Sequence, residues 1–428
     1  MTTDLVRTTL ADGVYLSVLN DKKFKHNRLS VNLIVPLNEE TVSGYAVLPF
    51  IMRKGSRECS DFTMLNRKLD SLYGAALAGD VSKAGANQII TLGVKVLDDR
   101  YALDNEKLLY EAALLLRDIV FDPVIENGSF AEKDFELERR FLIDTIEAQI
   151  NDKRGYAVSR CRELMGKNDA AAIRKYGTVE DAEKLTAKSA AESYKQLLSK
   201  SIVEVMLTGS GDAAEAAAVI KKAFEGIKRE PTDYAETAIR PAGEELLELT
   251  DRMDVAQSKM VLGFRLPKRG DAKQQAAARL MIALYGGTPS SKLFLNVREK
   301  LSLCYFASSI YHRAKNIVTL SSGIEFENYQ LAFDEIMEQL GAMRRGEWED
   351  WELDGARSTI MTAYKTMDDS ISRTEEFHLG AVATDLPDTP DELMRKIAEV
   401  TPERIRAAAE SIQLDSVYFL TGKEGADE

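Results

Sequence analysis

Histidine is scarce in this chain of 428 residues, which contains only His26, His312 and His378. Two histidines one helical turn apart are the usual core of a zinc-hydrolase motif, and no two of these three lie that close. A zinc site made by this chain alone would have to combine residues from remote positions. We therefore expect each histidine to be structural, and we expect the chain to bind no metal or other cofactor of its own.

Cysteine is equally rare, because Cys59, Cys161 and Cys304 are the only three and lie far apart. An odd number without a C-x-x-C pair argues against a disulfide framework and favours a reducing compartment. The N-terminal segment has no basic stretch followed by an apolar run, so no signal peptide is expected. No stretch approaches the roughly 18 apolar residues of a membrane span. The expected location is the cytoplasm, without membrane contact.

Clustered basic residues are also missing. The chain has 56 Lys and Arg against 69 Asp and Glu, which gives a formal net charge of -13. Nucleic-acid binding needs patches of Lys and Arg that neutralise phosphates, so no nucleic-acid partner is expected. The content of 45% hydrophobic and 29% charged residues is ordinary for a globular protein. The length exceeds what one hydrophobic core usually supports and indicates at least two domains.

An internal repeat organises the chain. The segment LNRKLDSLYGAA at 65–76 resembles LNVREKLSLCYFAS at 295–308, and a β-rich run follows each of them. Further on, FELERRFLIDTI at 135–146 corresponds to WELDGARSTIMT at 351–362. The two halves therefore read as copies of one unit.

Each half mixes strand and helix signals. Runs of Val, Ile and Leu predict strands at 28–37 and 258–267. Helical spacing predicts a helix at 274–287, and Ser129 with Glu132 reads as a capping box before another long helix. The pattern predicts an α+β class, with an antiparallel sheet and helices packed on one face in each half.

The domain boundaries follow from the repeat and from composition. Residues 228–245 contain Pro231, Pro241 and many charges, as an exposed linker would. We predict an N-terminal domain at 1–227 and a C-terminal domain at 246–428.

The segment GGTPSSKLFLNVREKLSLCYFASS at 286–309 carries the most specific signal. It resembles the second half of the M16 peptidases, also called insulinase-like or pitrilysin-like, in its glycines, its Ser pair, its V-R-E-K and the Tyr seven residues after the Arg. The resemblance extends over nearly the whole chain and is greatest to the two-domain processing-peptidase type. It implies that type's metallohydrolase fold, made of two homologous halves.

Catalytic members of that family carry H-x-x-E-H in the first half, where two histidines bind zinc and the Glu activates water. A downstream helix supplies a third ligand. When the stretch GYAVLPFIMRKG at 44–55 is aligned on its final Lys-Gly, no residue able to bind zinc remains. The positions that correspond to the ligands and the base are Ala46, Pro49, Phe50 and Thr145.

Two details accompany this loss. Pro49 would strain a helix interior, so we expect it in the first turn of a short buried helix, packed through its apolar neighbours. Glu138 corresponds to an outer-shell Glu of the family, seven residues before Thr145. The metal position is therefore predicted to be filled with apolar side chains.

Arg298 and Tyr305 match the family's second-half pair, which is thought to hold the substrate backbone and the developing oxyanion. A guanidinium stays charged and a neutral phenol is a good donor, so both residue types suit that role. The spacing alone favours a plainer interpretation, a surface Arg with an ion partner and a Tyr that packs at the start of a strand. Both interpretations stay open at this point.

Two further segments match substrate-binding parts of the family. Gly74, Ala75 and Ala76 fall where an edge strand pairs with the substrate, and small residues there permit close backbone approach. Gly286 and Gly287 are interpreted as a flexible turn near the substrate path. Their residue types are also common in turns that bind nothing.

The resemblance implies a non-catalytic subunit of a heterodimeric M16 peptidase, not an enzyme by itself. The partner subunit would carry H-x-x-E-H and zinc, while this chain would contribute Arg298, Tyr305 and half of a chamber for short or unfolded peptides. The alternative is a peptide-binding or scaffold protein without a role in cleavage. A stand-alone enzyme with an unrelated site is a third alternative, but the chain contains no catalytic motif for it. A homodimer of the isolated chain is also compatible with the sequence.

Overall fold

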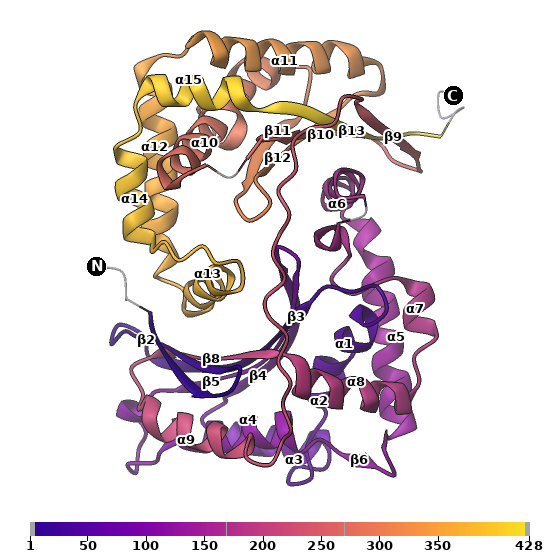
Figure 1. Cartoon of the computed structure of the whole chain (residues 1–428), viewed down its shortest axis with the longest axis vertical. Helices are drawn as coiled ribbons and strands as arrows, with labels where there is room; N and C mark the ends of the chain where they lie inside the picture. The colour runs from indigo at the N-terminus through magenta and orange to yellow at the C-terminus, as the bar shows by residue number, and fades with distance from the viewer. Residues whose placement is uncertain (1–4, 168, 269, 424–428) are drawn as a thin grey trace. The chain divides into compact units, whose positions relative to one another are not determined.

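The structure, a computed structural model, describes residues 5–167, 169–268 and 270–423. The chain forms two compact units (Figure 1). None of the described helices is long and apolar enough to cross a membrane. Unit 1 comprises residues 1–147, 173–236 and 368–387, and unit 2 comprises 148–172, 237–367 and 388–428.

The core of unit 1 is a six-stranded sheet in which all neighbouring strands are antiparallel except β2 and β8. Strand β4 lies at one edge and β1 at the other. In spatial order the strands are β1 (Val6–Ala11), β2 (Val14–Asn20), β8 (Ile202–Gly209), β3 (His26–Pro36), β5 (Asn87–Leu97) and β4 (Ala76–Ala84).

Unit 2 contains a five-stranded sheet with one parallel pair, β13 with β9. Its order is β11 (Phe306–His312), β12 (Ile317–Ile324), β10 (Ser258–Arg265), β13 (Gln413–Thr421) and β9 (Leu247–Arg252). With β1 set aside, β2-β8-β3-β5-β4 has the same arrangement as β9-β13-β10-β12-β11, including the parallel pair. The α+β class and the predicted duplication are thus visible in the topology.

Helices cover these sheets. In unit 1, odd-numbered side chains of β3 such as Leu29 and Val31 belong to the large apolar core, which the helices complete. These helices are α1 (Val42–Ala46), α2 (Leu48–Met52), α3 (Phe62–Ser71), α4 (Leu108–Phe121), α5 (Glu132–Ala148), α7 (Val179–Glu183), α8 (Ala187–Lys200) and α9 (Ala213–Ala223). Unit 2 has α6 (Lys153–Met165), α10 (Ala272–Ile282), α11 (Tyr329–Arg345), α12 (Asp350–Met367), α14 (Pro390–Ala398) and α15 (Pro402–Ser411).

Two helices are exchanged between the sequence halves. Helix α6 follows the first half's long helix α5 but packs on β10 and β13 of unit 2. Helix α13 (Ile371–Ala383) follows α12 but lies on the sheet of unit 1, on the face opposite α4 (Figure 1). There Leu379 packs against Ile34 of β3, and Glu375 pairs with Arg28 at 3.0 Å. The first sheet therefore has helical cover on both faces, and each compact unit draws a helix from the other half of the sequence.

Two local features differ from the sequence pattern or add to it. The capping box at Ser129 is wrong, because Ser129 lies in a two-residue strand, β7 (Ser129–Phe130), paired with β6 (Ile125–Glu126). Its hydroxyl donates to the carbonyl of Phe130.

Residues 228–245 contain no helix or strand, yet Arg229 donates hydrogen bonds to the carbonyls of Leu198 and Ser201. The first part of this segment is therefore tied to unit 1.

Candidate functional site

The stretch that corresponds to the zinc motif folds as two short helices, α1 and α2, which meet at Val47. Pro49 lies in the first turn of α2, as predicted, where its missing N–H costs little. Ala46 is fully buried and Phe50 nearly so. The two positions that would carry imidazoles are thus part of the apolar core of unit 1.

Aromatic side chains occupy the surroundings of Phe50. Its ring meets Phe141 of α5 edge-to-face at 5.1 Å between centroids, and Tyr176 lies at 6.5 Å. The guanidinium of Arg53 lies over both phenyl rings, 5.6 Å from Phe50 and 5.7 Å from Phe141. Such contacts between rings and cations are favourable beyond simple burial. The surroundings of Phe50 are therefore packed with aromatic rings and the Arg53 guanidinium.

An ion pair stands next to this aromatic cluster. Lys54 Nζ lies 2.6 Å from Oε1 of Glu138, whose side chain is only 4% exposed. The other carboxylate oxygen of Glu138 is buried and has no hydrogen-bond partner. A buried carboxylate needs a nearby cation to remain charged. Here a lysine of the chain itself supplies that positive charge.

These contacts also fix how the two segments run past each other. Lys54 meets Glu138 and Phe50 meets Phe141, so the stretch 46–54 runs antiparallel to α5. Continuing by one turn places Ala46 at the level of Thr145. Ala46 and Thr145 are the positions that the alignment predicts for two of the ligands.

None of these side chains can hold a zinc ion. Methyl and phenyl groups offer no lone pair, and the Thr145 hydroxyl donates to the carbonyl of Phe141 at 2.7 Å. Within residues 5–167, 169–268 and 270–423, no group of three or more His, Cys, Asp or Glu side chains is arranged to bind a metal. The residues at this position do not fit the family's zinc.

Tyr305 lies in unit 2, directly before edge strand β11, and its side chain is 61% exposed. Its backbone N–H donates to the carbonyl of Gly323 at 2.8 Å, which continues the pairing of β11 with β12. Its hydroxyl donates to the carboxylate of Glu325, and this hydrogen bond raises the pKa of the phenol. The phenol is therefore neutral and accessible. Glu325 holds its hydroxyl, and the hydrogen bond to Gly323 holds the backbone of Tyr305.

Arg298 lies in the last turn of the wide, π-helical segment Leu293–Lys300. Its guanidinium stacks on the ring of Phe294 at 4.6 Å, and its Nε lies 3.6 Å from a carboxylate oxygen of Glu299. The side chain is 40% exposed. Ser302, at a positive φ of 53°, then reverses the chain toward Tyr305. Arg298 and Tyr305 thus flank one tight turn and keep exposed polar ends.

The predicted substrate strand is a sheet edge. Ala76 begins β4, the last strand of the sheet in unit 1, while Gly74 has a positive φ of 72° and Ala75 is buried. In unit 2, Gly286 is buried, and a Cβ there would come within 2.7 Å of the Leu293 side chain. Gly287 is exposed. The two glycines end a π-helical turn, Ala283–Gly287. At Gly286, the close approach of Leu293 leaves no room for a side chain.

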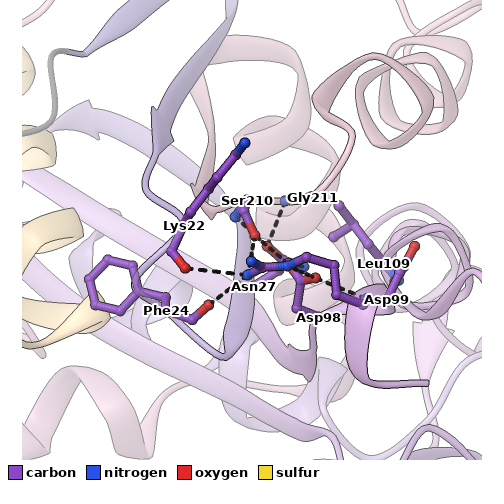
Figure 2. Close-up of polar contacts among 9 residues, drawn as sticks. Lys22, Phe24, Asn27, Asp98, Asp99, Leu109, Ser210 and Gly211 are labelled. Carbon is purple, nitrogen blue, oxygen red and sulfur yellow. Dashed lines mark hydrogen bonds and ion pairs between the residues drawn. The ribbon is translucent and has the colours of Figure 1, made fainter. Parts of the chain in front are cut away.

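A polar cluster in unit 1 looks like a hydrolase site but is arranged differently (Figure 2). Ser210 donates to Asp98 at 2.6 Å and accepts from Arg100. The adjacent N–H groups of Ser210 and Gly211 both donate to the side-chain oxygen of Asn27 at 2.9 Å. Burial opposes ionisation of Asp98, but the hydrogen bonds of Ser210 and Arg100 outweigh it and lower the pKa. The Ser210 hydroxyl donates to a carboxylate and not to an imidazole, and the two N–H groups are occupied, so the cluster joins loops of the sheet.

Comparison with known proteins identifies the family. Residues 184–360 match the family described as "Peptidase M16 inactive domain". The chain is 30% identical over 418 residues to the Bacillus subtilis protein named "Probable inactive metalloprotease YmfF", covering 97% of both chains.

Solved structures show the same fold. A conserved protein from Enterococcus faecalis V583 is 27% identical, with a TM-score of 0.90 over 99% of this chain and 100% of that one. A protease from Helicobacter pylori, 16% identical, superposes with a TM-score of 0.78 over 98% and 99%. The chain belongs to the M16 peptidase family.

Proposed function

We propose that this chain is the non-catalytic subunit of a heterodimeric zinc peptidase in the cytoplasm. A second chain with H-x-x-E-H supplies zinc and the general base. This chain supplies Arg298, Tyr305 and part of the surface that receives a short or unfolded peptide. It cleaves nothing by itself.

The observation that carries the proposal is a contrast between two positions in the chain. The zinc position is closed by buried apolar residues and by the Lys54–Glu138 ion pair. Arg298 and Tyr305, in contrast, keep exposed polar ends that contribute little to their own unit's packing. A chain that served only as a scaffold would need neither an accessible guanidinium at Arg298 nor an accessible phenol at Tyr305.

The chemistry of the pair suits a substrate carbonyl near a metal. The phenol of Tyr305 can donate to an oxygen that gains negative charge, and Glu325 holds it in place until it does so. The guanidinium of Arg298 offers several N–H donors and can bind a peptide carbonyl. Neither residue has to bind zinc, so both can act opposite a partner's metal.

Edge strand β4 supports the peptide part of the proposal. The carbonyl of Val81 accepts from Lys175 Nζ at 2.7 Å, so it points away from β5. Backbone groups alternate in direction along a strand, and Leu77 and Gly79 therefore share this outward direction. An extended peptide can add to the sheet there, at the N-terminal part of β4.

The test begins with the partner. The tagged chain is isolated from its own host, its co-purifying proteins are identified and zinc is quantified. A chain bearing H-x-x-E-H, recovered one-to-one with one zinc per pair, is the expected result. Recovery of this chain alone and metal-free would leave a binding role as the better explanation.

The pair is then reconstituted with Tyr305→Phe, with Arg298→Ala and with Tyr101→Phe, an exposed tyrosine of unit 1, as the matched control. Loss of an oxyanion donor typically lowers turnover by about 100-fold or more. We expect that loss for Tyr305→Phe, with unchanged assembly and with full activity of Tyr101→Phe. Equal activity of the Tyr305 and Arg298 variants and the unmodified pair would favour the scaffold alternative.

A further inference from the structure

We infer that unit 2 contains a binding site for a small organic anion, separate from Arg298 and Tyr305 and independent of the proposed peptidase role. The site is a pocket of about 370 Å³ between the end of β10, the first turns of α10 and helix α15. This volume lies near the lower end of the range of about 300–1,000 Å³ for small-molecule pockets.

Small side chains create the pocket. Helices α10 and α15 pack together and present Ala277, Ala278, Ala407 and Ala408 to the space between them. Leu266 and Pro267, which follow β10, complete the apolar wall. Ala277, Ala278 and Ala408 are nearly covered, whereas Ala407 and Pro267 are exposed, so an apolar group of a ligand would bury mainly the surface of these two residues.

One part of the wall is polar and rigid. Tyr311 donates from its hydroxyl to Asn316 Oδ1 at 2.7 Å, and Asn316 Nδ2 donates to the carbonyl of Lys268 at 2.7 Å. Asn316 is 2% exposed and has a positive φ of 53°. These contacts position the backbone that carries Lys268, so its side chain starts from a fixed point.

The charges at the pocket are uncompensated. Lys268, Lys273 and Arg404 line it, and among the described residues none of the three has an ion pair or a side-chain hydrogen bond. The single lining carboxylate, Asp271, is engaged in capping α10, where it accepts from the N–H of Gln274 at 2.8 Å. Among the lining residues that the structure describes, three cations against one engaged carboxylate give a net charge of +2, on a chain whose net charge is -13.

Apolar walls beside unpaired cations select a particular ligand class. A carboxylate joined to a small apolar body would place its charge at Lys268 and Arg404 and its apolar part against the alanines. A free organic acid and the C-terminal residue of a peptide both have this chemistry. A neutral ligand of the same shape would leave the cations without a partner.

Calorimetric titration of the full chain at low salt tests the inference. The probes are octanoate and N-acetyl-leucine, with octanamide and N-acetyl-leucinamide as their neutral counterparts. We expect at least one carboxylate to saturate a single site and to bind about tenfold or more tightly than its amide. Which of the two carboxylates binds identifies the source, an organic acid or a peptide C-terminus.

Three variants locate the binding. Lys268→Gln combined with Arg404→Gln removes the charge, and Ala407→Leu fills the exposed mouth without changing the core. Both changes are expected to weaken binding about tenfold or more while the melting temperature stays unchanged. Arg406→Gln, on the same helix but outside the pocket, is the matched control and should bind normally. Absence of saturable binding by either carboxylate, equal binding of the amides, or unchanged affinity in both pocket variants would overturn the inference.

Discussion

Replacing Lys54 with alanine tests the idea that a lysine compensates for the missing metal. Lys54 is 30% exposed, but its partner Glu138 is only 4% exposed, and one oxygen of Glu138 already lacks a hydrogen bond. Lys54→Ala would leave this carboxylate buried without its cation. The energetic cost therefore comes from the stranded charge and not from the lost lysine contacts.

The magnitude follows from burial. Removing one partner of a buried ion pair typically costs about 3–5 kcal/mol, and we expect about 3 kcal/mol because water can reach the space that Lys54 vacates. The pair Lys68–Glu111, also in unit 1, is the matched control, with an N–O distance of 2.7 Å and exposures of 35% and 42%. Lys68→Ala should cost about 0–1 kcal/mol, as exposed pairs do.

Urea unfolding at pH 7 provides the assay. Trp348 and Trp351 both lie in unit 2, so tryptophan fluorescence follows that unit, whereas far-ultraviolet circular dichroism follows both. Lys54→Ala should shift the dichroism transition much more than Lys68→Ala does. Adding Glu138→Gln to Lys54→Ala should recover part of the loss, because a neutral amide needs no cation. If Lys54→Ala costs no more than Lys68→Ala, or if Glu138→Gln brings no recovery, the compensation argument is wrong.

Three further predictions concern other parts of the chain. Burial, followed by the charge of Arg162, lowers the pKa of His312 to about 3. As the pH falls below about 6.5, the unfolded chain therefore binds a proton at His312 before the folded chain does. This difference should reduce the unfolding free energy by about 2 kcal/mol between pH 6.5 and 5. In urea titrations, His312→Gln should abolish this loss. Gly79→Ala would place a Cβ 2.6 Å from the carbonyl oxygen of Pro49 and should cost about 1–3 kcal/mol in thermal unfolding, whereas Gly380→Ala, with open space around it, should not destabilise the protein. After dialysis the unmodified chain should retain no stoichiometric zinc by elemental analysis, and Ala46→His, Pro49→Glu, Phe50→His and Thr145→Glu should all be needed together before it does, so tight zinc in the unmodified chain would contradict the alignment.

The sequence predicts the repeated sheet because strand signals are local. The Val-, Ile- and Leu-rich runs at 28–37 and 258–267 correspond to β3 (His26–Pro36) and β10 (Ser258–Arg265), each buried on both faces. The exchange of α6 and α13 is a different matter. The apolar face of an amphipathic helix does not specify which sheet it packs on. The internal repeat therefore predicts the order of the helices along the chain but not the sheet that each one covers.

The hairpin between β6 and β7 has a local sequence signal. Asn127 and Gly128, both at positive φ, form a tight turn between β6 and β7. Asn-Gly between extended residues is a strong hairpin signal. It outweighs the capping box suggested by Ser129 and Glu132, and helix α5 begins only after the hairpin.

The site was predictable in what it lacks and less so in what replaces it. The missing ligands follow from residue types alone, and Pro49 lies in a first helical turn because its ring restricts it to such places. The Lys54–Glu138 pair joins residues 84 positions apart in sequence. The hydrogen bond from Tyr305 to Glu325 joins the residue before β11 to the residue after β12. Such contacts depend on which elements become neighbours, which only the folded chain reveals.

The predicted zinc position and the position of Arg298 and Tyr305 contribute differently to the stability of the fold. At the predicted zinc position, Phe50 and Glu138 are buried, so changing them alters the stability of the fold and says little about function. At the exposed position, Tyr305 buries little of its ring. Arg298 stacks on Phe294 and has a long surface ion pair, worth about 0–1 kcal/mol. Folding therefore requires neither Tyr305 nor Arg298. Variants of these two residues should unfold like the unmodified chain, so any loss of activity that they cause in a reconstituted pair measures what they do to the substrate.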